Sequence, residues 1–132
     1  MLDKKEFKKR FKDKLPPMGI YKISNLAIGK VFIGSGLNVH GIINSQRFQL
    51  ENGAHRNAEL QEDFARLGGE RFSFDVLDIL ERKDGQDDYT EDLKALEEIW
   101  LDKLQPYGEK GYNKRKTGPA PATDLTKTVR SG

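Results

Sequence analysis

Two short strand patterns near the start of the chain restrict its fold more than any other feature. Residues 19–24 (GIYKIS) and 30–35 (KVFIGS) each consist of strand-forming residues with a glycine near one end. The segment between them, NLAIG, is rich in turn formers. We therefore predict a β-hairpin in this part of the chain.

The rest of the central chain alternates between helix and strand periodicity. The predicted elements are two helices, a strand and a third helix, at 38–53, 57–68, 71–80 and 90–105. Asn38 and Asn57 are suitable N-cap residues for the first two helices, and Gly53 and Gly68 are suitable ends. This order predicts an α/β (α+β) domain with a small three-stranded antiparallel sheet flanked by helices.

The two ends of the chain differ from this central part. Residues 3–15 carry three large apolar residues at four-residue spacing among lysines, which predicts an extra amphipathic helix at the N-terminus. After about Lys114 the sequence has few apolar residues, so we expect it to be disordered. The predicted division is an N-terminal helix at 1–17, a domain at 18–113 and a basic tail at 114–132.

Composition excludes several classes of protein. The chain has no cysteine, which excludes disulfides, thiolate zinc sites and cysteine nucleophiles. Its apolar runs are too short for a membrane span or a secretory signal, so we expect a cytoplasmic protein with no membrane partner. The motifs of phosphate-binding loops, dinucleotide-binding folds and Ser/His/Asp hydrolases are absent.

Charge is unevenly distributed along the chain. Residues 1–14 contain seven basic and three acidic residues, and residues 109–132 contain six and two, so each end carries a net charge of +4. Residues 15–108 contain ten basic and sixteen acidic residues, a net charge of −6. Proteins that bind nucleic acid tightly usually carry positive charge on the folded domain. The charge therefore predicts weak nucleic-acid binding or none by the core.

Glu97 occupies an unusual position in the last predicted helix. At about 100° per residue, Leu93, Leu96 and Trp100 define the apolar side of that helix. Glu97 projects about 40° from Leu93, within the apolar stripe, whereas Glu98 faces water. Because a buried lone charge is costly, Glu97 needs a partner. It is either a metal ligand or catalytic carboxylate, or a residue at the core edge paired to a lysine or a backbone group.

Four other polar residues are weaker candidates. Tyr21 is typical of a strand tyrosine that packs with its hydroxyl at the rim, although a catalytic role is the alternative. His40 and His55 lack a carboxylate at ligand spacing and are expected to be surface residues. Arg47 can contact a phosphate, but near the end of a helix it is more typical of a residue that complements the helix dipole.

The ordered motifs of residues 18–113 resemble those of the GIY-YIG nuclease family. Gly19-Ile20-Tyr21 and Phe32-Ile33-Gly34 stand where that family has its two name-giving triplets. Further matching segments are Ile33-Gly34-Ser35, Leu50, Gly53-Ala54-His55-Arg56-Asn57, Leu60-Gln61, Phe64, Leu67-Gly68, Phe72-Ser73-Phe74-Asp75-Val76-Leu77, Leu96-Glu97-Glu98-Ile99-Trp100-Leu101-Asp102 and Gly111-Tyr112-Asn113. The resemblance implies the same order of elements as the periodicity does.

The resemblance also implies roles for particular residues. Members of that family cut phosphodiester bonds in DNA, using two tyrosines, an arginine and a histidine on the first helix, and a glutamate that holds one divalent metal. Tyr21 matches the first tyrosine, and Glu97 matches the metal-binding glutamate. Phe32, Ile42 and Gln46 replace the second tyrosine, the arginine and the histidine. Metal and arginine would offset the negative charge that develops in the reaction.

These replacements predict a catalytically impaired member with a binding or regulatory role. Ile42 carries no charge, and Gln46 cannot accept a proton at neutral pH. The partner of such an impaired domain would be an unknown protein, or DNA that is bound weakly through Arg47, His55 and Asn57.

Two alternatives remain open. One is a divergent Mg²⁺- or Mn²⁺-dependent endonuclease that uses Tyr21 and Glu97, with Arg47 or His40 recruited to the site. The other is a protein-interaction module built on the N-terminal helix and the basic ends of the chain.

Overall fold

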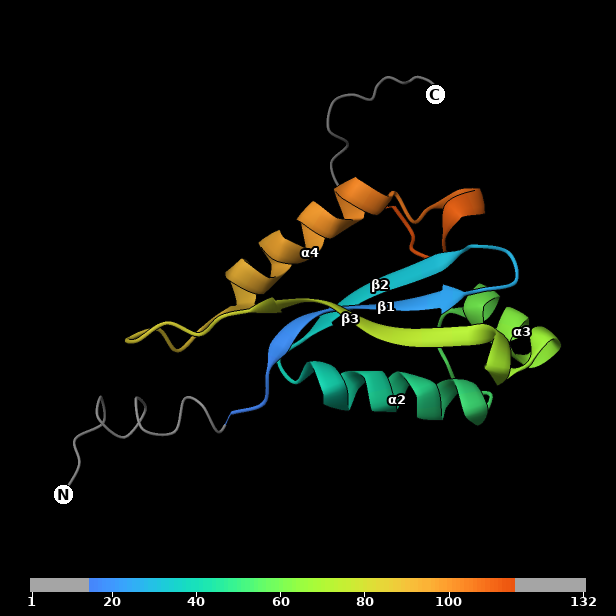
Figure 1. Ribbon diagram of the computed structural model, residues 1–132, viewed down its shortest axis with the longest axis horizontal. Coiled ribbons are helices and arrows are strands. Elements are labelled where there is room, and N and C mark those ends of the chain that lie inside the picture. The colour runs from blue at the N-terminus through green and yellow to red at the C-terminus, as the bar shows by residue number, and fades with distance from the viewer. Residues whose placement is uncertain (1–14, 116–132) are drawn as a thin grey trace.

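Residues 15–115 form one antiparallel sheet with helices on both faces in the computed structural model (Figure 1). The three strands are β1 (Met18–Asn25), β2 (Val31–Gly36) and β3 (Phe72–Leu80), in the spatial order β2-β1-β3. Both strand pairs are antiparallel, so the predicted hairpin and three-stranded sheet are confirmed. The predicted N-terminal helix and most of the predicted C-terminal tail lie outside the described residues.

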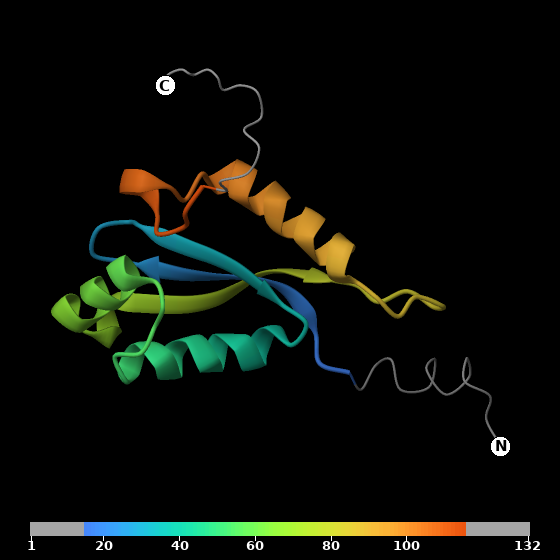
Figure 2. The ribbon, with the colours of Figure 1, turned by 180° about the vertical axis from the view of Figure 1, so that it is seen from behind.

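Three α-helices cover the sheet: α2 (Val39–Glu51) and α3 (Ala58–Leu67) on one face, and α4 (Thr90–Leu104) on the other (Figures 1 and 2). The predicted N-caps are confirmed. The Asn38 side chain accepts a hydrogen bond from the Gly41 amide, and the Asn57 side chain accepts one from the Leu60 amide. These caps satisfy backbone donors that the first turn of a helix leaves unpaired.

Each face of the sheet has its own apolar core because successive side chains of a strand point to opposite faces. The core on the α2 side consists of Tyr21, Ile23, Val39, Ile43, Leu50, Leu60, Phe64, Phe72 and Tyr112. The core on the α4 side is built on Ile20, Ile33 and Leu93. Central strand β1 is buried along almost its whole length, since helices cover it from both sides.

The C-terminal segment returns to the outer edge of β2. Gly111 forms a parallel bridge to Val31, and the amide of Tyr112 donates to the carbonyl of Val31 at 2.9 Å. The Asn113 side chain then bonds both the amide and the carbonyl of Ile33. This pairing satisfies part of the free edge of β2 and holds residues 112–114 beside Phe32.

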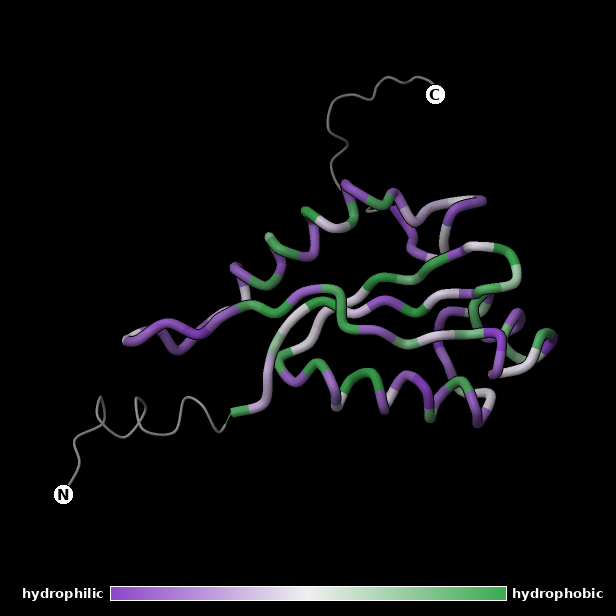
Figure 3. The backbone as a smooth tube through the Cα atoms, viewed as in Figure 1, coloured by the Kyte–Doolittle hydropathy of each residue, from purple (hydrophilic) through white to green (hydrophobic). Residues whose placement is uncertain are grey.

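Figure 3 shows apolar residues along the strands and a continuous polar stretch at the connection between β3 and α4. That connection includes residues 82–88, most of which are exposed. Within residues 15–115, no helix combines the length and the apolar content that crossing a membrane requires.

Candidate functional site

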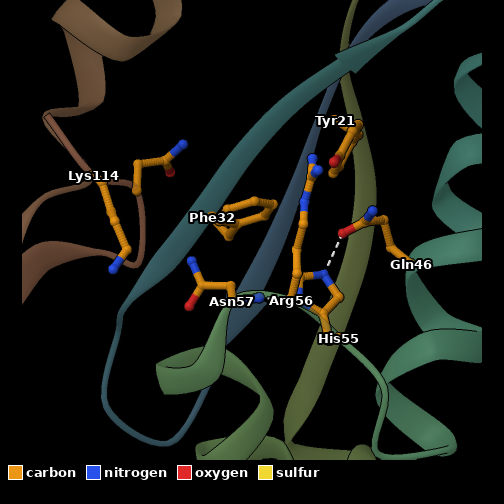
Figure 4. Close-up of a pocket in the computed structure, with 8 residues that line it drawn as sticks. Tyr21, Phe32, Gln46, His55, Arg56, Asn57 and Lys114 are labelled. Atoms are coloured by element: carbon orange, nitrogen blue, oxygen red, sulfur yellow. Dashed lines mark hydrogen bonds between the residues drawn. The ribbon is translucent and has the colours of Figure 1, made fainter. Parts of the chain in front are cut away.

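A cleft of about 310 Å³ opens beside β2, between α2, the loop before α3 and the C-terminal segment (Figure 4). Its lining residues are Tyr21, Phe32, Gln46, His55, Arg56, Asn57, Asn113 and Lys114. Two of them, Arg56 and Lys114, are cations, and none is a carboxylate. The cleft is therefore locally basic, although the central part of the chain is acidic overall.

Tyr21 contributes a buried hydroxyl to this cleft. Its ring crosses β2 directly over Gly34, where an added β-carbon would lie 2.2 Å from the hydroxyl oxygen. Burial raises the pKa of Tyr21 to about 12, and the negative charge of Glu97 adds to this effect while Arg56 opposes it. The hydroxyl is therefore protonated at neutral pH and can donate or accept a hydrogen bond, but it is not a phenolate.

Glu97 does not line the cleft; it approaches β2 from α4. One of its carboxylate oxygens accepts a hydrogen bond from the Ser35 hydroxyl at 2.6 Å. The partner that its position in the apolar stripe requires is thus a serine hydroxyl, rather than a lysine or a backbone group. Ser35 follows Gly34, so the carboxylate and the Tyr21 hydroxyl are neighbours across this strand, in agreement with their electrostatic coupling.

The donor set around Glu97 fits only a weakly held metal ion. Among residues 15–115, no group of three or more His, Asp or Glu side chains is placed to hold one. Mg²⁺ retains several of its waters and is often bound through one or two carboxylates. The free oxygen of Glu97 could hold such a hydrated ion, which would supply positive charge against a bound phosphate.

His55 is buried, with 7% of its surface exposed, so the expectation of a surface histidine is wrong. The loop folds back onto β2, and the ring packs edge-on against Phe32 at 5.9 Å between centroids. Nδ1 accepts a hydrogen bond from the Asn57 amide at 3.0 Å. The neutral ring therefore carries its proton on Nε2, which donates to the Gln46 side chain.

These two bonds leave His55 poorly suited to take a proton from a substrate. Both ring nitrogens are engaged, and protonation of Nδ1 would break the bond from the Asn57 amide. Burial and the nearby charge of Arg56 lower the pKa of His55 below its ordinary value. His55 thus holds the loop in place as a neutral residue.

The two replaced positions on α2 have different surroundings. Ile42 packs against the core and against Gly36, where an added β-carbon would lie 2.8 Å from its side chain. It does not line the cleft. Gln46 does line the cleft, and its side-chain oxygen is occupied by His55. Neither position supplies a charge.

Arg47 and His40 also lie outside the cleft lining. Both are exposed on α2. The Arg47 guanidinium stacks over the Phe74 ring at 4.5 Å, and the last turn of α2 contains no basic residue. The dipole role expected of Arg47 is therefore wrong. Of the three residues expected to contact nucleic acid, His55 and Asn57 line the cleft and Arg47 does not.

Sequence reasoning missed four residues of this region: Ser35, Arg56, Asn113 and Lys114. Arg56 is the most informative of them. It extends from the loop past Phe32 toward Tyr21 (Figure 4), and its charge acts on both Tyr21 and His55. Arg56 stands within the quoted segment 53–57, but a loop has no periodicity that indicates where a side chain points.

We expect the free energy of unfolding to decrease as the pH is lowered from about 7.5 to about 5.5. The pKa of His55 is below its ordinary value of 6.5 in the folded protein, so the unfolded chain binds a proton that the folded chain excludes. The contribution of neutral His55 to the free energy of unfolding is complete above the pKa that His55 has in the unfolded chain. It is lost as the pH falls below that pKa. Urea titrations at several pH values measure the change.

His40 provides the control, since it is the other histidine and is exposed. The His55→Gln variant should lose most of this pH dependence, and the His40→Gln variant should keep it. If His55→Gln unfolds with the same pH dependence as the parent, His55 is not the group responsible.

No protein-family model and no curated protein matches the sequence. Among solved structures, the chain is similar to the catalytic domain of I-TevI, a GIY-YIG homing endonuclease. The identity is 25% and the TM-score is 0.62, over 75% of this chain and 99% of that one. The chain is also similar to a mutant of the catalytic domain of the intron endonuclease I-TevI, with 24% identity and a TM-score of 0.62 over 77% of this chain and 97% of that one.

This similarity agrees with the motifs of residues 18–113 and with the order of elements that they imply. A three-stranded antiparallel sheet with three helices is common to both. Residues 15–115 therefore have the GIY-YIG nuclease fold.

Proposed function

We propose that this domain binds a backbone phosphate of nucleic acid in the cleft and cleaves nucleic acid very slowly or not at all. One observation carries the proposal. The cleft holds two cations and no carboxylate, while Ile42 and Gln46 occupy the positions at which the family has its arginine and histidine. DNA is the polyanion suggested by the endonuclease domain to which the chain is similar.

The binding part of the proposal rests on available donors. Within residues 15–115, the side chains of Arg56 and Lys114 form no hydrogen bond or ion pair with one another or with their neighbours. The cleft amides are already engaged: Asn57 donates to the Tyr112 carbonyl, and Asn113 is paired with Ile33. Two unpaired cations in one cleft favour an anionic ligand.

The catalytic part rests on what the cleft lacks. Removal of one donor that stabilises transition-state charge commonly lowers kcat by about 10²–10³. Ile42 and Gln46 supply no charge. Tyr21 is protonated at neutral pH, and both ring nitrogens of His55 are already hydrogen-bonded. A phosphate bound in the cleft would therefore have no effective proton acceptor beside it.

A slow metal-dependent endonuclease is the second candidate. It is favoured by the retention of Tyr21 and Glu97 on the two sides of Gly34, where the negative charge of Glu97 contributes to the raised pKa of Tyr21. In this case Glu97 would hold a hydrated Mg²⁺ or Mn²⁺, and the ion would offset charge on the phosphate.

Binding and cleavage assays with the full chain test the proposal. We expect fluorescence anisotropy to show binding of labelled single-stranded and duplex DNA that weakens steeply with added salt, because phosphate contacts release counterions. Incubation of plasmid or branched DNA with Mg²⁺ or Mn²⁺ should give no cleavage above background.

Two results would overturn the two parts separately. Absence of binding at low salt would remove the binding role. Robust cleavage that disappears in Glu97→Gln would favour the second candidate, since that substitution removes the carboxylate charge while keeping the side-chain shape.

A further inference from the structure

We infer that Arg56 is the phosphate-contacting residue of this cleft, so that the positive charge absent from position 42 of α2 is supplied from the loop before α3. The inference rests on the proposed binding of nucleic acid and names the residue responsible for it. Lys114, on the C-terminal segment, is the second contact. The ligand is one phosphodiester group of a DNA strand.

The loop that carries Arg56 is anchored on both sides of this residue. The His55 amide donates to the Gln61 side chain at 2.9 Å, and its ring is bonded to Gln46 and to the Asn57 amide. Asn57 in turn donates to the Tyr112 carbonyl at 2.8 Å. The backbone of Arg56 is therefore fixed, and its side chain extends from a defined starting point.

The side chain of Arg56 crosses the cleft rather than pointing away from it. Figure 4 shows it passing beside Phe32 toward Tyr21, and its charge counteracts the effect of burial on the Tyr21 hydroxyl. The guanidinium has no carboxylate partner within residues 15–115. An arginine with a free planar fork matches the geometry of two phosphate oxygens.

Lys114 lies on the other side of Phe32 from Arg56 (Figure 4). Its position is set by Asn113, which is bonded to both polar groups of the Ile33 backbone. Both cations line the same cleft, so each adds positive potential for a phosphate bound beside β2. The arrangement brings together two charges that are far apart in the sequence.

The replacement at position 46 is consistent with this arrangement. A glutamine side-chain oxygen accepts the Nε2 proton of His55 and keeps the ring neutral. Gln46 thereby helps to fix the loop on which Arg56 stands. Gln46 thus has two effects: it removes a proton-transfer group from α2, and it supports the loop.

Titration with labelled DNA over a range of salt concentrations tests the inference. Arg56→Met removes the charge and keeps an unbranched side chain of similar length. We expect the affinity to fall by about tenfold and the slope of log K against log salt to decrease by about one unit, because one phosphate contact is lost. Arg56→Lys should show an intermediate affinity with the parental slope.

Arg47→Met is the matched control, since Arg47 is an exposed arginine outside the cleft lining. It should leave both the affinity and the slope unchanged. Thermal unfolding of each variant, measured in parallel, confirms that the fold is retained, as expected for substitutions at exposed residues.

The outcomes separate this inference from the proposed function. Binding by the parent chain with an unchanged affinity in Arg56→Met would overturn the role of Arg56 and leave nucleic-acid binding standing. Equal losses in Arg56→Met and Arg47→Met would also overturn it, because general charge would then explain the effect. No binding by the parent chain would overturn both.

Discussion

Gly19→Ala is expected to lower the free energy of unfolding by about 3 kcal/mol or more. A β-carbon on Gly19 would lie 2.0 Å from the carbonyl oxygen of Asp78 and 3.1 Å from the α-carbon of Ile79. Both atoms belong to the backbone of β3, beside the irregularity between Ile20 and Tyr21 in the pairing of β1 with β3. A strand backbone can move away only by breaking that pairing.

Gly85→Ala is the matched control. Gly85 has φ 82°, and an added β-carbon would meet nothing within 4 Å. Gly85→Ala should therefore lower the free energy of unfolding by about 1 kcal/mol, through backbone strain alone. Urea unfolding followed by circular dichroism measures both variants. A loss in Gly19→Ala no larger than that in Gly85→Ala would show that β1 and β3 do not approach as closely as described.

The two glycines of the name-giving triplets therefore serve different purposes. Gly19 allows β3 to approach β1, which is a requirement of the sheet. Gly34 allows the Tyr21 ring to cross β2, since an added β-carbon would meet its ζ-carbon at 2.3 Å as well as its hydroxyl. The first glycine belongs to the fold, whereas the second determines the shape of the cleft.

The fold could be predicted because its determinants are local. Alternation of apolar residues marks β3, and Asn38 and Asn57 cap their helices through bonds three residues ahead. The need of Glu97 for a partner could also be inferred from the angular position of Glu97 on α4. What could not be read from periodicity is that this partner is Ser35, on a strand far away in the sequence.

The cleft was harder to predict because tertiary structure assembles it from irregular segments. His55 and Arg56 lie in a loop, and neither the burial of His55 nor the direction of Arg56 has a sequence signature. The net charge of −6 over residues 15–108 was also misleading. Folding places Arg56, from this acidic range, in the same cleft as Lys114, from the basic range 109–132, so charges summed along the sequence conceal a local basic site.

Restoration of three side chains is expected to produce metal-dependent cleavage at least about 100-fold above that of the parent chain. The variant combines Phe32→Tyr, Ile42→Arg and Gln46→His. Positions 42 and 46 are four residues apart and therefore share one face of α2, and Gln46 and Phe32 already line the cleft. The imidazole at position 46 can act as a proton acceptor only when its basic nitrogen is not bonded to His55 Nε2, so the restored variant gives up the bond that Gln46 makes to the loop.

The control is the same variant with His40→Arg in place of Ile42→Arg. Position 40 is exposed and lies about 160° around the helix from position 42, so it adds the same charge away from β2. Plasmid nicking with Mg²⁺ or Mn²⁺ measures the effect, and Glu97→Gln in the restored variant should abolish it. Equal cleavage by the control would show that overall charge, rather than the α2 face, limits the reaction. No cleavage by the restored variant would mean that the impairment lies beyond these three side chains.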